Sequence, residues 1–159
     1  MGTNDIDCLI IGVGNEDRGD DGAGLAVARR ARDAAPATVR VCESNGDGAA
    51  LLNLWQGADA VWLVDAVRSG APPGAMHRVD VHATALPSYR FGSSSHAFGV
   101  AQAVELARQL HRLPARFTII GIEGRNFSLG SRMSPEVAQA VELVVQELLS
   151  HCPVCSPPS

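Results

Sequence analysis

The sequence predicts an α/β fold, a three-layer sandwich in which a mostly parallel, twisted, five-stranded sheet lies between helices on both faces. Apolar segments of strand length alternate along the chain with segments whose apolar residues recur at helical spacing. Several strand segments are apolar at every position, which is typical of parallel strands buried on both faces. The length of 159 residues is that of one ordinary domain.

Five segments are expected to form the strands of this sheet. Each has the length of a strand, and most of their residues taken together are apolar. They are residues 8–13, 39–42, 61–64, 76–81 and 117–122.

Four helices are expected between and after these strands. Residues 24–34 and 49–55 form the first two, and Val100 to Leu110 carries an apolar residue every third or fourth position. The fourth begins at Ser134-Pro135, a helix-start signal that precedes a long apolar stripe. We expect one domain over residues 1–150, followed by a disordered tail over residues 151–159.

Composition excludes several classes of function. Apolar residues make up 46% of the chain, charged residues 19%, and the formal charge is −4, so we expect neither a nucleic-acid partner nor a membrane surface. All 13 basic residues are arginine, which excludes any mechanism that needs a lysine. Because no long apolar run and no basic leader are present, we expect a cytoplasmic protein.

Acidic residues follow most of the predicted strands. The carboxyl ends of parallel strands share one edge of the sheet, where α/β proteins bind their ligands. Two or three carboxylates and one imidazole could therefore converge there and hold a borderline divalent metal such as nickel or zinc. The candidates are Asp20, Asp21, Glu43, Asp65, His96 and Glu123.

Each candidate also has a purely structural explanation. Asp20 or Asp21 could cap the first helix, an effect of about 1 kcal/mol, and Asp65 could cap a turn. His96 could be an ordinary surface or helix-end residue, and Glu123 could pair with Arg125. The convergence of several candidates, rather than any single residue, supports a site.

The glycine-rich loop after the first strand does not fit a phosphate site. The third glycine of a dinucleotide-binding pattern would fall at Asp17, and four acids in the loop would repel a pyrophosphate. An EF-hand is excluded because its alternating oxygen ligands are absent. We therefore expect the loop to bind a cation.

Two other chemical patterns are weak. Residues 93–95 are serines next to His96, but no Gly-x-Ser-x-Gly nucleophile elbow occurs in the chain. Cys152 and Cys155 have the spacing of a zinc half-site, but the second pair of ligands is missing.

Four separated blocks resemble the hydrogenase maturation proteases, in colinear order from about residue 8 to residue 149. The first is LIIGVGNEDRGDDGAG at residues 9–24 and the second is LVDA at residues 63–66. SHAFG at residues 95–99 is the third. The fourth combines GIE at residues 121–123 with the segment 129–137, which contains a Met-Ser-Pro step.

The resemblance implies an endopeptidase that removes the C-terminal extension of a nickel-iron hydrogenase large-subunit precursor after nickel insertion. The family's metal-contacting positions fall on Asp21, Asp65 and His96. No resident cofactor is expected, because the nickel is contributed by the substrate and the protease ligands recognise it there. Discrimination is then a difference in affinity between loaded and empty precursor. Asp21 is also the candidate catalytic residue, with either a carboxylate base or the metal activating water.

Further residues are expected to support this site. Asn15, Asp20 and Glu123 would hold the ligands in place, and the loop glycines would let the substrate approach the backbone; they are Gly12, Gly14 and Gly22. Two positions depart from the family pattern, Asp17 and Gly124. The alternative function is a non-enzymatic nickel-loading sensor or chaperone of the large subunit, which the sequence does not separate from a protease.

Overall fold

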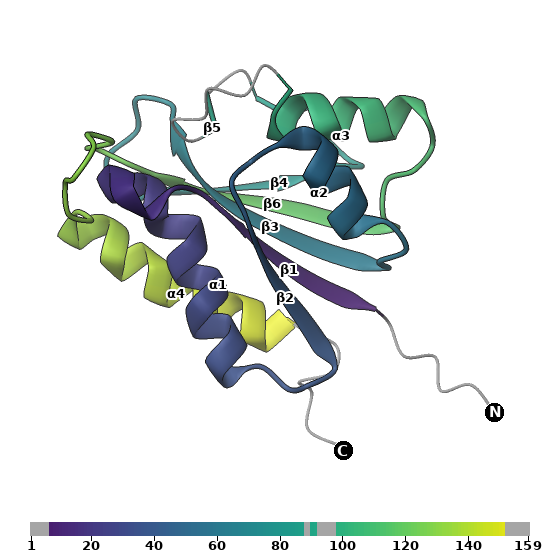
Figure 1. Cartoon of the computed structure of the whole chain (residues 1–159), viewed down its shortest axis with the longest axis horizontal. Coiled ribbons are helices and arrows are strands. Elements are labelled where there is room, and N and C mark those ends of the chain that lie inside the picture. Colours follow the sequence, from purple (N-terminus) through teal and green to yellow (C-terminus); the bar gives the residue numbers. More distant parts are fainter. Residues whose placement is uncertain (1–6, 88–89, 92–97, 152–159) are drawn as a thin grey trace.

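The computed structural model describes residues 7–87, 90–91 and 98–151, and these form one sheet with helices on both faces (Figure 1). The strands are β1 (Cys8–Val13), β2 (Val39–Ser44), β3 (Ala60–Arg68), β4 (Met76–Asp80), β5 (Arg90–Phe91) and β6 (Arg116–Glu123). The helices are the 3-10 helix η1 (Glu16–Gly22), α1 (Ala23–Ala34), α2 (Gly48–Trp55), α3 (Val100–Gln109) and α4 (Pro135–His151).

The order of strands in the sheet is β2-β1-β3-β6-β4, and β5 pairs with the end of β3. β1, β2, β3 and β6 are parallel, whereas β4 runs antiparallel to β6 and β5 antiparallel to β3. β1 connects through α1 to β2 on one side and has β3 on the other. The carboxyl end of β1 is therefore the topological switch point, where a crevice opens in such sheets.

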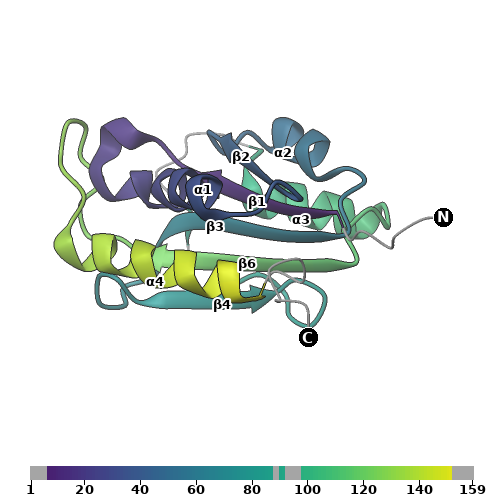
Figure 2. The same ribbon diagram turned by 90° about the horizontal axis from the view of Figure 1, so that it is seen from below.

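Two apolar layers hold the helices to the sheet. α1 and α4 cover one face around Ile10, Val64 and Ile120, and α2 and α3 cover the other around Ile11 and Leu63. Figures 1 and 2 show these two helix layers with the sheet between them. The alternation of side chains along β1 and β3 supplies both layers, which explains their continuously apolar sequences.

The contact between α1 and the sheet is unusually close because it is made through glycines. A Cβ atom on Gly24 would lie 2.3 Å from the carbonyl oxygens of Val13 and Val64, and one on Gly12 would lie 2.1 Å from the carbonyl oxygen of Gly24. Only hydrogen side chains allow the backbone of α1 to rest on β1 and β3 at this distance. The first turn of α1 is thereby fixed directly over the switch point.

The predicted fold class and the predicted strands and helices are confirmed, with small changes at their ends. β5 and η1 were not predicted, because the first is only two residues long and the second has no apolar periodicity. Among the described residues, no helix is long and apolar enough to span a membrane. The predicted tail lies almost entirely in residues 152–159, outside the described part of the chain.

Replacing Gly24 by alanine is expected to destabilise the protein despite the better helix propensity of alanine. The new methyl group would collide with two backbone carbonyls that cannot move independently, and overpacking of this kind costs about 1–3 kcal/mol or more. Urea unfolding followed by circular dichroism measures the loss. Gly57→Ala is the control: its φ of 81° makes alanine unfavourable by about 1–2 kcal/mol, but its Cβ would meet no atom within 4 Å. A Gly24→Ala midpoint equal to that of the wild type would contradict the packing argument.

Candidate active site

Asp21 and Asp65 meet at the switch point. Asp65 is the first residue of β3 beyond the part paired with β1, whose last pair is Gly12 with Val64. Asp21 lies near the end of η1, which follows β1 and packs against β3. The two side chains are close enough for the charge of Asp21 to act on Asp65, and their joint role as metal ligands stays a prediction.

A kink in η1 turns its second half toward the interior. Arg18 and Gly19 leave helical geometry, and Gly19 has φ 56° and ψ −115°, a conformation that favours glycine. Residues 15–18 are exposed, whereas the two aspartates after the kink are buried. The kink therefore carries Asp20 and Asp21 from a surface loop into the protein.

Asp65 is buried, and few groups around it stabilise a negative charge on its carboxyl group. It is only 2% exposed, and its Oδ1 atom has no hydrogen-bond partner among the described residues. Burial raises the pKa of Asp65 well above its ordinary value, and the nearby charge of Asp21 raises it further, against one opposing hydrogen bond from the Ala66 N–H. A carboxylate in this position needs either a proton or a cation.

The third predicted ligand, His96, lies outside the described residues. In sequence it comes four residues before Val100, the first residue of α3. The described residues alone contain no group of three or more His, Cys, Asp or Glu side chains arranged to hold a metal ion. Asp21 and Asp65 supply two oxygen-bearing groups, and a complete site requires another ligand from the remaining chain or from a substrate.

Asp20 has a structural role as an anchor of η1. It is fully buried, and its carboxylate accepts hydrogen bonds from the N–H groups of Arg125, Asn126 and Ser134 at 2.8, 2.9 and 2.6 Å, and from the Ser134 hydroxyl at 2.8 Å. Burial by itself raises the pKa of Asp20, but these donors outweigh it and hold the pKa below its ordinary value. Asp20 thus joins η1 to the β6–α4 connection (residues 124–134).

Neither aspartate caps α1, so the helix-cap explanation is wrong. The residue before α1 is Gly22, and no side chain forms a capping hydrogen bond there. Asp20 instead bonds to Ser134, the residue directly before α4.

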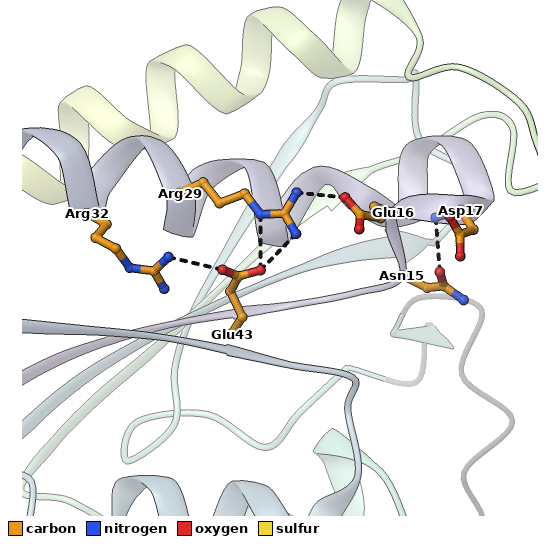
Figure 3. A network of polar contacts seen from close by, with 6 residues as sticks. All are labelled: Asn15, Glu16, Asp17, Arg29, Arg32 and Glu43. Atoms are coloured by element: carbon orange, nitrogen blue, oxygen red, sulfur yellow. Dashed lines mark hydrogen bonds and ion pairs between the residues drawn. The ribbon is translucent and has the colours of Figure 1, made fainter.

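Asn15 contacts Asp21 through its backbone, because the Asn15 N–H donates a hydrogen bond to the carbonyl oxygen of Asp21 at 3.2 Å. The Asn15 side chain is exposed and accepts a hydrogen bond from the Asp17 N–H at 3.0 Å, which caps η1. Its support of the metal ligands stays a prediction. Glu43 instead pairs with Arg29 at 3.0 Å and Arg32 at 3.2 Å and so ties β2 to α1 as a surface ion-pair residue (Figure 3).

Glu123 belongs to a separate polar cluster. It is 2% exposed and accepts hydrogen bonds from the N–H and hydroxyl of Ser69, and it lies 3.2 Å from Nε2 of His77. Burial raises the pKa of Glu123, but Ser69 and His77 outweigh it and lower the pKa. Its carboxylate therefore braces the turn after β3 rather than the metal ligands, and Arg125, its suggested partner, pairs with Glu136 instead.

The glycines of the loop serve internal packing instead of substrate approach. A Cβ on Gly12 would collide with α1, and a Cβ on Gly14 would lie 2.0 Å from the carbonyl oxygen of Asp21. Gly22 is buried beside the backbone of Glu16. These positions are filled by the protein's own chain, so the predicted role in substrate approach is corrected.

Comparisons with known proteins identify the family of this fold and site. The model of the hydrogenase maturation protease family matches residues 26–151. The chain belongs to the hydrogenase maturation protease family. Its enzyme class is accordingly that of an endopeptidase, a hydrolase that acts on a peptide bond.

Individual relatives cover nearly the whole chain. A putative hydrogenase maturation protease of Methanocaldococcus jannaschii is 29% identical over 152 residues, which cover 91% of this chain and 96% of the relative. The hydrogenase expression/formation protein HupD of Rhodobacter capsulatus is 28% identical over 144 residues, covering 87% and 68%.

Solved structures show the same fold. The hydrogenase maturating endopeptidase HybD of E. coli superposes with a TM-score of 0.75 at 21% identity, with 90% of each chain covered. The [NiFe] hydrogenase maturation protease HybD of Thermococcus kodakarensis has a TM-score of 0.71 at 26% identity, with 90% of this chain and 97% of that chain covered.

In this maturation protease, Asp20→Ala is expected to lower stability by about 3 kcal/mol, because it leaves the buried N–H and hydroxyl of Ser134, together with two part-buried backbone N–H groups, without an acceptor. For a domain of this size the melting temperature should fall by about 10 °C. Asp17→Ala, an exposed change in the same 3-10 helix, should alter stability by no more than about 0.5 kcal/mol.

The pH dependence provides a second check on Asp20. Since the folded-state pKa lies below the ordinary value of 3.8, the stabilisation is complete above about pH 4 and is lost as the pH falls through the lowered pKa. Equal melting curves for Asp20→Ala and Asp17→Ala at neutral pH would contradict the anchoring role.

Asp65→Asn is expected to stabilise the metal-free protein at neutral pH. Because the folded-state pKa is raised, the folded protein holds the Asp65 proton more tightly than the unfolded chain, so stability falls as pH rises from about 4 toward the raised pKa. Asparagine does not titrate, so Asp65→Asn should lose this pH dependence. We expect its free energy of unfolding to rise by about 1 kcal/mol, a gain typical of substitutions at functional sites. For a domain of this size, that gain raises the melting temperature by about 3 °C.

Calorimetry between pH 4 and pH 8 measures this effect, with Asp17→Asn as an exposed control of the same chemistry. A difference between Asp65→Asn and wild type that stays constant over this range would show that Asp65 carries no unfavourable buried charge.

Proposed function

We propose that this protein removes the C-terminal extension of a nickel-iron hydrogenase large-subunit precursor after nickel insertion, and that Asp21, Asp65 and His96 bind the nickel carried by the substrate. The observation that carries this proposal is the buried pair at the switch point, in which an oxygen of Asp65 has no hydrogen-bond partner among the described residues. A divalent cation would compensate both carboxylates at once.

The proposal treats nickel as part of the substrate. Two carboxylates and an imidazole suit a borderline divalent ion, but the ion also needs the cysteines of the precursor to complete its coordination. When a precursor without nickel binds, Asp65 stays buried beside another carboxylate, and these carboxylates contribute no favourable binding free energy. Cleavage after loading follows from this difference in affinity.

Asp21 is proposed to have a second role in the reaction. Lying beside the bound nickel, its carboxylate can accept a proton from the attacking water while the metal polarises the scissile carbonyl. The partner is the large-subunit precursor, and the cellular compartment is that of nickel insertion, the cytoplasm.

The central test is cleavage of purified nickel-loaded precursor, followed by mass spectrometry of the large subunit. Wild type should release a C-terminal peptide from loaded precursor and leave nickel-free precursor intact. Asp21→Ala and His96→Ala should remain folded and lose at least about 100-fold in rate, a reduction typical for the loss of an acid–base group. Asp17→Ala is the matched control and should cleave normally.

Normal processing by both Asp21→Ala and His96→Ala would refute the site assignment. Intact precursor mass with wild type, together with stable binding of loaded precursor, would instead support the alternative of a nickel-loading sensor or chaperone.

Metal analysis tests the proposal that no resident cofactor is needed. The purified protease should contain much less than one metal ion per chain and still cleave loaded precursor. A stoichiometric metal whose removal by a chelator abolishes cleavage, and whose return restores it, would overturn this part of the proposal.

A further inference from the structure

A pocket of about 700 Å³ opens beside the candidate active site. It lies between the turn after β3 (residues 69–75) and the β6–α4 connection, the segment that Asp20 anchors. Its charged and aromatic lining residues are Arg68, Glu123, Arg125 and Phe127.

Arg68 is held in this pocket by stacking instead of by an ion pair. Its guanidinium carbon lies 4.0 Å from the ring centroid of Phe127, which is only 8% exposed and belongs to the core next to α4. Within the described chain, the guanidinium makes no hydrogen bond and no ion pair. Stacking fixes its plane and leaves the N–H groups along its edge available, the arrangement in which arginine binds carboxylates through two parallel hydrogen bonds.

The other charges of the pocket are already compensated. Glu123 receives its hydrogen bonds from Ser69 and lies against His77, while Arg125 pairs with Glu136 at 3.0 Å. The charge of Arg68 is therefore the one left uncompensated among these lining residues, in a protein whose formal charge is −4. A ligand with a negative charge fits this pocket, and a cation does not.

The pocket lies within a short peptide's reach of the nickel ligands. Arg68 follows Asp65 by three residues on the same strand, and a strand rises about 3.3 Å per residue, so their backbones are about 10 Å apart. Because the two residues are three positions apart, their side chains lie on opposite faces of the strand, Asp65 on the face of Leu63 and Arg68 on the face of Val64. A substrate peptide that reaches both therefore passes over the carboxyl edge of the sheet, where the turn after β3 and the β6–α4 connection line the pocket.

We propose that Arg68 and the pocket around it bind a carboxylate side chain of the substrate peptide, outside its nickel-binding residues. This inference rests on the proposed function, because it takes the hydrogenase precursor as the ligand. Arg68 is then a specificity-determining residue: it selects the sequence next to the cleavage site, whereas Asp21 and Asp65 select the metal.

The test compares Arg68→Gln with wild type on nickel-loaded precursor. KM should rise by about tenfold and kcat should stay within twofold, since a charge-assisted contact to substrate is lost while the reacting groups are unchanged. Arg68→Lys should lie between the two, because it keeps the charge and loses the planar fork. Arg116→Gln, an exposed arginine at the opposite end of the sheet, is the matched control and should keep the wild-type KM.

Substrate variants identify the source of the carboxylate. In one precursor the acidic residues before the cleavage point are changed to amides, and in a second those after it. The precursor that lacks the recognised carboxylate should show a raised KM with wild type and no further rise with Arg68→Gln. The inference is overturned if Arg68→Gln keeps its KM, loses only kcat, or weakens all precursors equally.

A binding measurement separates this inference from the proposed function. The dissociation constant of fluorescently labelled loaded precursor is measured for wild type and Arg68→Gln, with melting curves to confirm that both are folded. If wild type binds but does not cleave, the proposed protease activity fails on this substrate, while a tenfold weaker binding by Arg68→Gln still supports the pocket. Equal binding by both proteins refutes it.

Discussion

The carboxylate of Asp20 is the contact on which the arrangement of the site depends. It is fully buried and joins η1 to residues that lie 105 to 114 positions further along the chain. On one side it fixes the residue before Asp21, and on the other it fixes the backbone that lines the pocket around Arg68. Because charge-assisted hydrogen bonds to buried N–H groups are directional, the two segments are held in one geometry.

Near this anchor lies the carboxyl group of Asp65, whose negative charge would be poorly stabilised by its surroundings. Asp65 could have been replaced by an apolar residue with a gain in stability, yet it lies where β1 and β3 diverge, the place at which α/β sheets bind ligands. Buried groups with strongly shifted pKa values are common at functional sites for this reason. The contrast between Asp20, whose pKa is lowered, and Asp65, whose pKa is raised, separates the acid that anchors η1 from the acid that we propose as a nickel ligand.

Much of the fold could be predicted from the sequence, because periodicity reports directly on burial. The rule that strand ends share one edge also placed Asp21 and Asp65 at the same end of the sheet, while their metal-binding role stays a prediction. The role of Asp20 could not be predicted, since three of its four donors are backbone N–H groups, which leave no signal in the residue types. The partners of Glu123 were missed for a related reason: Ser69 follows β3 and His77 lies on β4, and the sequence did not reveal that β4 pairs antiparallel with β6.

The shared anchor also has a consequence for cooperativity. Asp21 and the part of the Arg68 pocket formed by residues 124–128 lie on segments joined through Asp20, so a ligand that orders one segment lowers the entropy cost of ordering the other. A precursor that makes both proposed contacts would bind more tightly than the sum of two separate contacts predicts, by an amount set by the effective concentration of the second contact. The Asp20 carboxylate would thus couple the proposed recognition of the metal to the proposed recognition of the peptide.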